Sequence, residues 1–364
     1  RSTTLSIVQQ DPGSSRQRST MRDVAALASV SIKTVSRVVN DEAGVSHDLV
    51  HRVEEAALQL DYHPNLAASN LRRSGRKTET VGLMLEDVAN PFSSAVHRAI
   101  GDAAADRGIA VLASSLDEDP VRERQVARAM IRRRVDGLVI VPTGNDQSYL
   151  RSEMLAGIAM VFIDRAPGFL DADTVLATNR EGARDAVSHL LAAGHRRIAF
   201  LGDLRKIATA SDRYRGYVEA LQAGGIRIGE RLVRTDLHTR DAADSAAHEL
   251  LRLPVEVAPT ALFTSQNLVT IDTVRALRQR DLQHLVALVG FDDVELADML
   301  DPGITVVAQD PFKMGIEAAE LLFARLDGDR GPSKRRLIST RLIERGSGEI
   351  RPSSADIATR SHQE

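Results

Sequence analysis

The sequence predicts a small all-α head followed by an α/β core of two doubly wound, parallel-sheet subdomains. Its 364 residues suit two or three domains, because most domains hold ~100–200 residues. Between Thr20 and Tyr62, short runs with apolar residues at spacings of three and four predict three small helices. After Thr80, continuous apolar runs alternate with amphipathic stretches, a pattern typical of parallel sheets that helices cover on both faces.

The head follows a polar arm, residues 1–19, which has no sustained period and contains the turn-forming cluster DPGSS. Such a composition predicts disorder. The head itself is assigned to residues 20–64, where Ser31 and Ser46 each precede a new periodic segment and are expected to be helix N-caps. Residues 65–79 are expected to form a linker with one short helix. This linker holds a set of cations: Arg72, Arg73, Arg76 and Lys77.

The core is assigned to residues 80–346, and residues 347–364 to a flexible tail. Apolar runs predict strands at 81–85, 109–114, 137–141, 159–163, 174–178, 198–202, 261–265, 285–290 and 304–308. Helices are expected between most of them, including 92–107, 180–193, 241–252, 268–279 and 312–326. This number of strands suits two halves, roughly 80–177 with 309–334 and 178–308 with 335–346.

Composition excludes several classes of protein. The chain has no Cys, which excludes disulfides, thiolate metal sites and a cysteine nucleophile. No apolar run approaches the ~18 residues of a membrane span, and the first residues lack the apolar core of a signal peptide, so a cytoplasmic protein without a membrane partner is expected. Catalytic motifs such as GxGxxG, HExxH and GxSxG are missing, and no cofactor or metal is expected. The adjacent carboxylates Asp292 and Asp293 are only a weak indication of acid/base catalysis.

The net charge of −3 at first argues against a protein that binds nucleic acid, because neutralising phosphates requires an excess of Lys and Arg. The charges are unevenly divided, however. Residues 1–77 contain 11 Lys and Arg against 8 Asp and Glu, a net charge of +3. The remaining 36 basic and 42 acidic residues give a net charge of −6. The head and linker are therefore suited to phosphate, and the acidic core to a different partner.

Polar side chains follow most of the predicted core strands, at the edge where ligands bind in open parallel sheets. They are Asp87, Asp164, Arg165, Asp203, Gln266, Asn267, Asp292, Asp293, Gln309 and Asp310. A single aspartate at such a position often only caps the next helix. The whole set, in contrast, would surround a cleft with carboxylates, amides and guanidinium groups, each of which can bridge neighbouring hydroxyls. The set favours a polyhydroxylated ligand.

Segment 31–40, SIKTVSRVVN, has two distinct helical faces. At about 100° per residue its valines fall on one side, and the opposite side carries Ile32, Lys33, Ser36 and Arg37. Cations beside an exposed apolar side chain can read guanine edges and thymine methyl groups, although a basic face is more often simply solvated. A very short turn joins this segment to the preceding helix, which is the helix-turn-helix spacing that places the second helix in the major groove.

At this point a family resemblance is evident. TMRDVAALASVSIKTVSRVVN (20–40) resembles the headpiece signature of the LacI/GalR family of bacterial transcriptional repressors. Further similar motifs follow in the family's order: YHPNLAASNL (62–71), VGLMLEDVANPF (81–92), VDGLVIVP (135–142), FIDR (162–165), GHRRIAFLGD (194–203), DRYRGY (212–217), VGFDD (289–293) and QDPFKMG (309–315). The resemblance covers roughly residues 20–346 and implies a core like that of periplasmic binding proteins.

The resemblance implies roles for residues of the head and hinge. Ile32, Lys33 and Arg37 would face bases, which specify the site. Phosphate contacts, or support of the recognition helix, are implied for Thr20, Ser31, Thr34, Ser36, Asn40 and Ser46. Leu71 matches the hinge leucine that, in the family, wedges into the central minor-groove step of the operator.

The resemblance also implies roles in the core. Phe92 would pack on the effector, and Arg213 and Asp292 would bind its polar edge. The cleft would further be lined by Asp164, Arg165, Asn267 and Gln309. Two departures stand out: Gln266 and Asn267 occupy positions where the family often has Asn-Asp, and Ser29 occupies a turn position where Gly is common.

The mechanism that the resemblance implies is a homodimer bound to a pseudo-palindromic operator and controlled by a small effector in the cleft. A sugar or polyol is the favoured effector, because only 3% of residues are aromatic and no second ring is evident to stack a base. Three alternatives remain: a repressor with a purine-type corepressor, a sugar-binding protein for transport, and a sugar-acting enzyme. The residues after Gly346 show no leucine heptad, which favours a dimer over a tetramer.

Overall fold

A computed structural model describes residues 19–40, 42, 44–62 and 78–352 of the chain. The chain divides into two compact units, Arg1–Thr78 and Glu79–Glu364, and each is described by itself. The predicted arm except Ser19, most of the predicted linker with Leu71, and most of the predicted tail lie outside the described residues.

Three helices form the head: α1 (Met21–Leu27), α2 (Ile32–Val39) and α3 (His47–Gln59). They share a very small core of apolar side chains, as the periodicity predicts: Val24, Ala25, Ala28, Val35, Val53 and Ala56. Ser31 is the N-cap of α2, where its hydroxyl oxygen accepts a hydrogen bond from the Thr34 backbone N–H at 3.1 Å. Ser46 occupies the N-cap position of α3 without a side-chain capping bond.

The first half of the core is a six-stranded sheet in the order β11-β5-β4-β3-β1-β2, in which all pairings are parallel. Its strands are β1 (Thr80–Leu85), β2 (Ala110–Ser115), β3 (Gly137–Ile140), β4 (Ala159–Ile163), β5 (Asp173–Ala177) and β11 (Arg335–Ile338). Its helices are α5 (Pro91–Ala105), α6 (Pro120–Arg132), η1 (Ser148–Leu150), α7 (Arg151–Leu155) and α12 (Pro311–Leu326). α5 and α12 cover one face of the sheet, and α6 with η1 covers the other.

The second half has a six-stranded sheet in the order β12-β10-β9-β8-β6-β7, in which only β12 is antiparallel to its neighbour. Its strands are β6 (Ile198–Leu201), β7 (Val233–Arg234), β8 (Ala261–Thr264), β9 (Ala287–Phe291), β10 (Thr305–Ala308) and β12 (Arg341–Ile343). Its helices are α8 (Asn179–Ala192), α9 (Ala208–Ala223), η2 (Glu230–Leu232), α10 (Arg240–Leu251) and α11 (Asn267–Gln279). α8 and α9 lie on one face, and α10 and α11 on the other.

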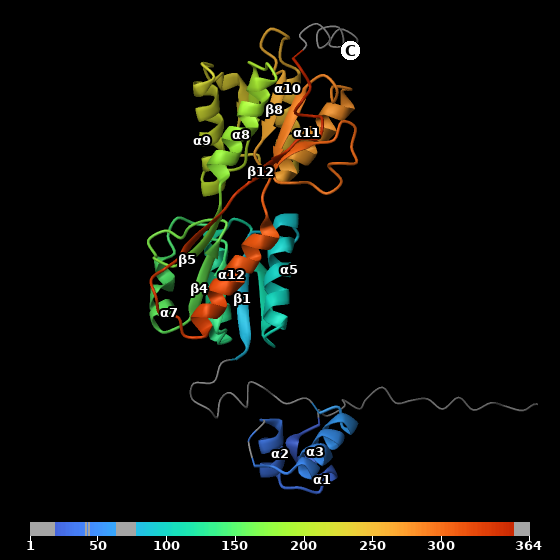
Figure 1. The fold of residues 1–364 in the computed structure, drawn as a ribbon, viewed down its shortest axis with the longest axis vertical. Helices are drawn as coiled ribbons and strands as arrows, with labels where there is room; N and C mark the ends of the chain where they lie inside the picture. Colours follow the sequence, from blue (N-terminus) through green and yellow to red (C-terminus); the bar gives the residue numbers. More distant parts are fainter. Residues whose placement is uncertain (1–18, 41, 43, 63–77, 353–364) are drawn as a thin grey trace, which may run out of the picture. The chain divides into compact units, whose positions relative to one another are not determined.

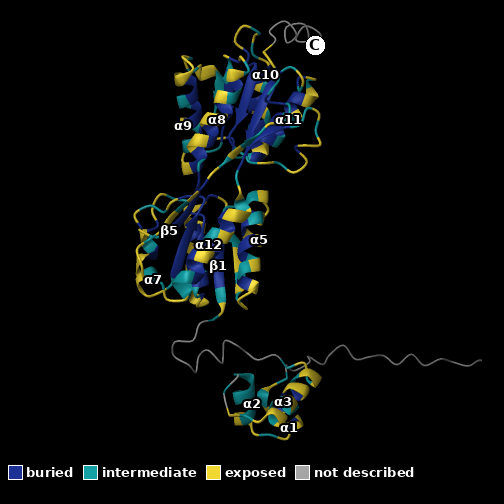
Figure 2. Cartoon of the chain, in the orientation of Figure 1, coloured by how far each residue is buried: buried dark blue, intermediate teal, exposed yellow. Residues whose placement is uncertain are grey.

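The strands of both sheets are buried while the outer sides of the helices are exposed (Figure 2). This arrangement confirms the predicted class, an all-α head with an α/β core of two doubly wound, parallel-sheet halves. All nine predicted strands form, with ends that shift by at most two residues. None of the described helices combines the length and the apolar character needed to cross a membrane.

The chain crosses between the halves of the core three times in the described residues: from β5 to α8, from β10 to α12 and from β11 to β12 (Figure 1). Two of these crossovers are tied together. The backbone N–H of Thr340 donates to the hydroxyl oxygen of Thr178 at 2.8 Å, and the two hydroxyl oxygens lie 3.0 Å apart. The crossovers therefore form a connected hinge between the halves.

Two predicted boundaries are wrong. Residues 335–338, expected in the second half, form β11, which pairs with β5 of the first sheet. Its sequence RRLI is too polar to mark it as part of a buried sheet. The tail was also expected to begin at Ser347, but this residue is only 2% exposed. Its hydroxyl donates to the carbonyl oxygen of Leu288 at 2.6 Å and accepts from the backbone N–H of Thr305 at 2.9 Å, so it belongs to the second half.

Candidate nucleic-acid interface and ligand cavity

The two faces of α2 are arranged as the sequence predicts. Val35 is completely buried, and the other two valines of the helix pack against the core of the head. On the outward side, Ile32 is 46% exposed and Lys33 is exposed. The Arg37 side chain is 37% exposed, and its Nε lies 3.8 Å from Oε2 of Glu42. The three residues predicted to read bases therefore share the accessible side of one helix.

Three of the residues predicted to contact phosphates stand at helix N-termini. Thr20, Ser31 and Ser46 are the N-caps of α1, α2 and α3. Thr20 donates to Oδ2 of Asp23 from its backbone N–H at 2.8 Å and from its hydroxyl at 2.7 Å. These two hydrogen bonds hold the pKa of the Asp23 carboxyl below its ordinary value. Unpaired N–H groups make helix N-termini suitable for phosphate oxygens.

The remaining members of the predicted set support α2. The Thr34 hydroxyl lies 2.9 Å from the Ser31 hydroxyl at the beginning of the helix. At its end, the Asn40 amide donates to the Ser36 carbonyl oxygen at 2.6 Å and lies within 3.3 Å of the Ser36 hydroxyl. Leu71, the predicted minor-groove wedge, lies outside the described residues.

The geometry of the turn before α2 shows why glycine is common at position 29 in the family. Ser29 has a φ of 53°, in the left-handed region that glycine adopts without steric cost. Arg52, which the sequence reading missed, supports this turn from α3. Its Nη2 donates to the carbonyl oxygen of Ala28 at 2.5 Å. A single Arg on the polar side of a helix gives no sequence signal for such a role.

The core contains a cavity to which both halves contribute. It encloses about 500 Å³ of space, a figure that includes open solvent at its mouth. The seven residues predicted to bind an effector all line it: Phe92, Asp164, Arg165, Arg213, Asn267, Asp292 and Gln309. The structure therefore brings together residues from distant segments in the way that the strand-end pattern predicts.

On the side of the first half, one arginine serves two buried carboxyl groups. Nη1 of Arg165 donates to Oε2 of Glu118 at 2.9 Å, and its Nε lies 3.3 Å from Oδ2 of Asp164. All three residues are at most 8% exposed. Burial raises the pKa of the Asp164 carboxyl, and Arg165 opposes this effect. The sequence reading missed Glu118 because it lies in a loop after β2.

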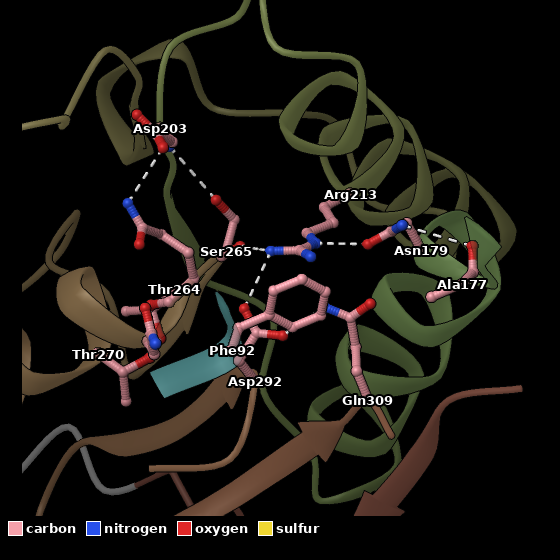
Figure 3. Close-up of polar contacts among 12 residues, drawn as sticks. Phe92, Ala177, Asn179, Asp203, Arg213, Thr264, Ser265, Thr270, Asp292 and Gln309 are labelled. Carbon is pink, nitrogen blue, oxygen red and sulfur yellow. Dashed lines mark hydrogen bonds and ion pairs between the residues drawn. The ribbon is translucent and has the colours of Figure 1, made fainter. Parts of the chain in front are cut away.

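On the side of the second half, Arg213 of α9 holds Asp292 (Figure 3). Its Nη1 donates to the Ser265 carbonyl oxygen at 2.6 Å and to Oδ2 of Asp292 at 3.3 Å. Nε donates to Oδ1 of Asn179 at 2.7 Å. The other Asp292 oxygen accepts from the Gln309 amide at 2.6 Å. This network fixes several hydrogen-bonding groups around one face of the cavity.

An amide contact joins the two halves across the cavity. Nδ2 of Asn267, at the beginning of α11, donates to Oδ1 of Asn90 at 3.1 Å. Asn90 is the N-cap of α5, where the same oxygen accepts from the backbone N–H of Phe92 at 3.0 Å. A carboxylate at position 267 has no hydrogen to donate to this oxygen. The amide that departs from the family pattern is thus the group that makes the contact.

Two further carboxyl groups line the cavity: Glu86, which the sequence did not single out, and Asp203, which belongs to the predicted set of strand-end residues. Glu86 directly follows β1, whereas the sequence reading selected its neighbour Asp87, whose carboxylate instead accepts from the Ala89 N–H at 2.9 Å. Asp203 lies two residues beyond the end of β6 and accepts from the Gln266 amide at 3.1 Å. Its other oxygen lies 2.9 Å from Nδ1 of His238, and this contact raises the pKa of the imidazole. His238 is distant in sequence, so no local pattern could connect it with Asp203.

The polar groups of the cavity are suited to binding a ligand. Its polar groups are carboxylates, amides and guanidinium groups in fixed orientations. Among the described residues, no group of three or more His, Asp or Glu side chains could hold a metal ion. Carboxylates and amides that are already held by neighbours can accept and donate hydrogen bonds to ligand hydroxyls without rearranging.

The chain is similar to known transcriptional regulators. Residues 20–65 match the family model of bacterial regulatory proteins, lacI family, and residues 187–348 match that of the periplasmic binding protein-like domain. The HTH-type transcriptional repressor CytR of Escherichia coli (strain K12) is 30% identical over 335 residues, which cover 92% of this chain and 97% of that protein.

Solved structures of transcriptional regulators are also similar to this chain. The transcriptional regulator CelR–cellobiose complex is 30% identical, with a TM-score of 0.65 over 91% of this chain and all of the other. The lac repressor dimer bound to operator and the anti-inducer ONPF has a TM-score of 0.78 over 91% of this chain and 99% of that one. Its identity of 24% supports a shared fold.

Proposed function

Since the chain belongs to the LacI family of bacterial regulatory proteins, we propose that it represses transcription by binding a pseudo-palindromic operator as a homodimer. A small, polyhydroxylated effector in the core cavity controls this binding. As a member of the family the chain is a DNA-binding transcriptional regulator. In this role the protein acts in the cytoplasm, where its DNA lies.

The observation that carries the DNA-binding proposal is the outward face of α2. Ile32, Lys33 and Arg37 are accessible there, while Val35 is fully buried beneath them. The hydroxyl groups at the three helix N-termini are suited to phosphate oxygens, which would fix the position of α2 in the major groove. Arg37 must exchange its contact with Glu42 for a contact with guanine.

Effector control is supported by the position and chemistry of the cavity. It lies between the halves, so a ligand within it contacts both and biases the angle between them. Its paired carboxylates and amides suit vicinal hydroxyls, and the partly buried Phe92 ring can pack against the apolar side of a sugar. A relative of 30% identity has been solved as a cellobiose complex. By linkage, the effector must bind the DNA-bound and free forms unequally, typically by about 1–3 kcal/mol.

The DNA-binding proposal is tested by selecting duplexes from a random pool with the full chain. The wild type should enrich an inverted repeat, because a homodimer presents two related α2 helices. Arg37→Ala should lose discrimination at one base pair of each half-site, by about 1–3 kcal/mol. Arg215→Ala, which removes an exposed arginine of α9, is the charge-matched control. Enrichment of no repeat, or an unchanged base preference of Arg37→Ala, would overturn the proposal.

Effector control is tested by screening sugars, polyols and nucleosides for thermal stabilisation and for a change in operator affinity. A ligand at 100 times its dissociation constant should stabilise the chain by about 2.7 kcal/mol. Asp292→Asn should abolish the response because Arg213 and Gln309 lose their shared carboxylate. A response only to purines would favour the corepressor alternative, and turnover of a sugar would favour the enzyme.

A further inference from the structure

The cavity contains more carboxyl groups than cations. The acidic side chains in it or directly behind it are Glu86, Glu118, Asp164, Asp203 and Asp292. The cations are Arg165 and Arg213, and His238 adds a third when it is protonated. Arg213 is paired with Asp292, His238 with Asp203, and Arg165 with two carboxyl groups.

Glu86 is the carboxyl group without a partner. In the described part of the chain its side chain makes no hydrogen bond or ion pair, although the residue is mostly buried and lines the cavity. Burial raises the pKa of this carboxyl to about 7, and the negative charges of Glu118 and Asp203 act in the same direction. Arg165 and His238 oppose the shift without cancelling it. An unpaired carboxylate in such a place is costly.

Glu86 and Asp203 occupy corresponding positions in the two halves. Glu86 directly follows β1, and Asp203 follows β6 after Gly202; the two strands have the same place in the two sheet orders. Both side chains line the one cavity, and the charge of Asp203 contributes to the raised pKa of Glu86. The two halves therefore face each other with like charges, which oppose their approach.

A second, independent feature indicates that a ligand belongs here. Thr209, near the beginning of α9, lines the cavity and is only 8% exposed. Its hydroxyl bonds to no described residue and is accessible from the cavity. In the same cavity, Oε1 of Gln309 is buried without a hydrogen-bond partner among the described residues, whereas buried polar atoms normally have one. A metal ion does not account for these unpaired groups, since no metal-holding group of side chains occurs among the described residues. An organic ligand with both a cation and hydroxyls would satisfy them.

We propose that the cavity selects an effector with a protonated amine on a polyhydroxylated body, as in an aminodeoxy sugar, and that Glu86 is the residue that selects the amine. The ammonium group lies between Glu86 and Asp203, and the hydroxyls contact Thr209 and the Asp292–Gln309 pair. This inference rests on the proposed effector role of the cavity. A bound ammonium group attracts both Glu86 and Asp203, whose carboxylates otherwise repel each other. Binding of the amine and approach of the two halves are therefore coupled.

The test measures binding to the full chain by calorimetry at pH 7.5. The probes are 6-amino-6-deoxy-D-glucose and the corresponding aminodeoxy forms of galactose, mannose and ribose, each with its neutral parent sugar. We expect at least one amine to bind 10-fold or more tightly than its parent. In Glu86→Gln this advantage should fall below about threefold, while Glu230→Gln, which changes an exposed acid far along the chain, should retain it. An advantage for no amine, or an advantage that survives Glu86→Gln, overturns the inference.

A second readout is the proton balance of binding. Because the pKa of Glu86 is about 7 in the empty cavity, an ammonium that binds the carboxylate displaces a fraction of a proton. Calorimetry in two buffers of different ionisation enthalpy should detect this release in the wild type and in Glu230→Gln, but not in Glu86→Gln. Identical proton balances in all three proteins overturn the inference.

Operator affinity separates this inference from the function on which it rests. If a neutral sugar, but no amine, changes operator affinity, the proposed effector role stands and the inference fails. If the chain selects no operator, the proposed function fails whatever the cavity binds.

Discussion

The two halves of the core use the same backbone device at the cavity but different charges. Asp164 follows β4 and Asp292 follows β9, and both have a φ of 69°. The backbone N–H of each donates across to the next strand at 2.9 Å, to Val175 from Asp164 and to Val307 from Asp292. Two corresponding aspartates are therefore presented to the cavity from the same kind of strand end.

The residues that follow these aspartates make the difference. Arg165 turns inward and shares its charge between Asp164 and Glu118. In the second half the corresponding residue is Asp293, which turns outward to a bidentate contact with Arg345 at 2.6 and 2.8 Å. This contact lowers the pKa of the Asp293 carboxyl.

The second half obtains its cation from a helix instead. Arg213 of α9 serves one carboxylate together with neutral oxygens. The second half is therefore close to electrostatic balance, whereas the first half has one cation for three acids when Glu86 is included. Equal backbone geometry does not imply equal ligand chemistry, and the first half determines which charge a ligand must bring.

The largest expected effect is the loss of the shared cation. Arg165→Met leaves two buried carboxyl groups without compensation and should lower the free energy of unfolding by about 3–5 kcal/mol at pH 7.5. Arg213→Met should cost less, about 2–3 kcal/mol, because Asp292 retains the Gln309 amide. Chemical denaturation of both variants measures the difference. An equal or larger cost for Arg213→Met would show that the halves do not differ as described.

The next largest effect is a stabilisation, expected when the unpaired carboxyl group of Glu86 is removed. The pKa of Glu86 is raised from its ordinary 4.5 to about 7, so its ionisation weakens the folded state progressively between these pH values and fully above pH 7. Glu86→Gln should therefore stabilise the chain above pH 7 by up to about 3 kcal/mol, and by nothing below pH 4.5. Thermal unfolding from pH 4 to pH 8.5 checks the profile. The unfolding temperature of Glu230→Gln should change with pH as that of the wild type does. If Glu86→Gln also follows the wild type, the first half does not have the proposed excess of negative charge.

A smaller effect concerns the bond between the halves. A double-mutant cycle with Asn90→Ala and Asn267→Ala should give a coupling energy of about 0.5–1.5 kcal/mol, the usual net contribution of one hydrogen bond. Denaturation of the four proteins provides the number. A coupling energy of zero would mean that the amide contact does not hold the halves together in solution.

The smallest effect is expected at the outward counterpart of Arg165. Asp293→Asn breaks a partly exposed ion pair with Arg345 and should cost no more than about 1 kcal/mol. Added salt should reduce the difference from the wild type, because exposed charges are screened. A cost comparable with that of Arg165→Met would remove the contrast between the two positions.

The fold could be predicted largely because its central strands are continuous apolar runs. The strands that escaped prediction, β7, β11 and β12, have two to four residues and include arginines. Their sequences resemble loops, and only pairing with a neighbour makes them strands. The same limit explains the tail, because Ser347 is buried only through hydrogen bonds to distant backbone groups.

The cavity could be predicted in part because charged residues at strand ends are visible in a sequence. Glu86 was missed because the two adjacent acids after β1 point to different surroundings, and sequence alone does not reveal which one turns inward. Thr209 was missed because a threonine near a helix start carries no distinctive signal. The roles assigned to the head residues and to Leu71 by family resemblance stay predictions.

The crossings between the halves have a consequence for the order of synthesis. The first sheet is made early up to β5, but α12, which covers one of its faces, begins only at Pro311. The second half in turn is completed only by β12 and the segment around Ile350. The carbonyl oxygen of Ile350 lies 2.7 Å from Nε2 of His195. A growing chain therefore holds two unfinished sheets at once. Within the described residues, both are completed only by the segment from Pro311 onward, which contains α12, β11 and β12. Stopping translation after Ala308 would leave one face of the first sheet covered by α5 alone and the part under α12 exposed, although five of its six strands had been made.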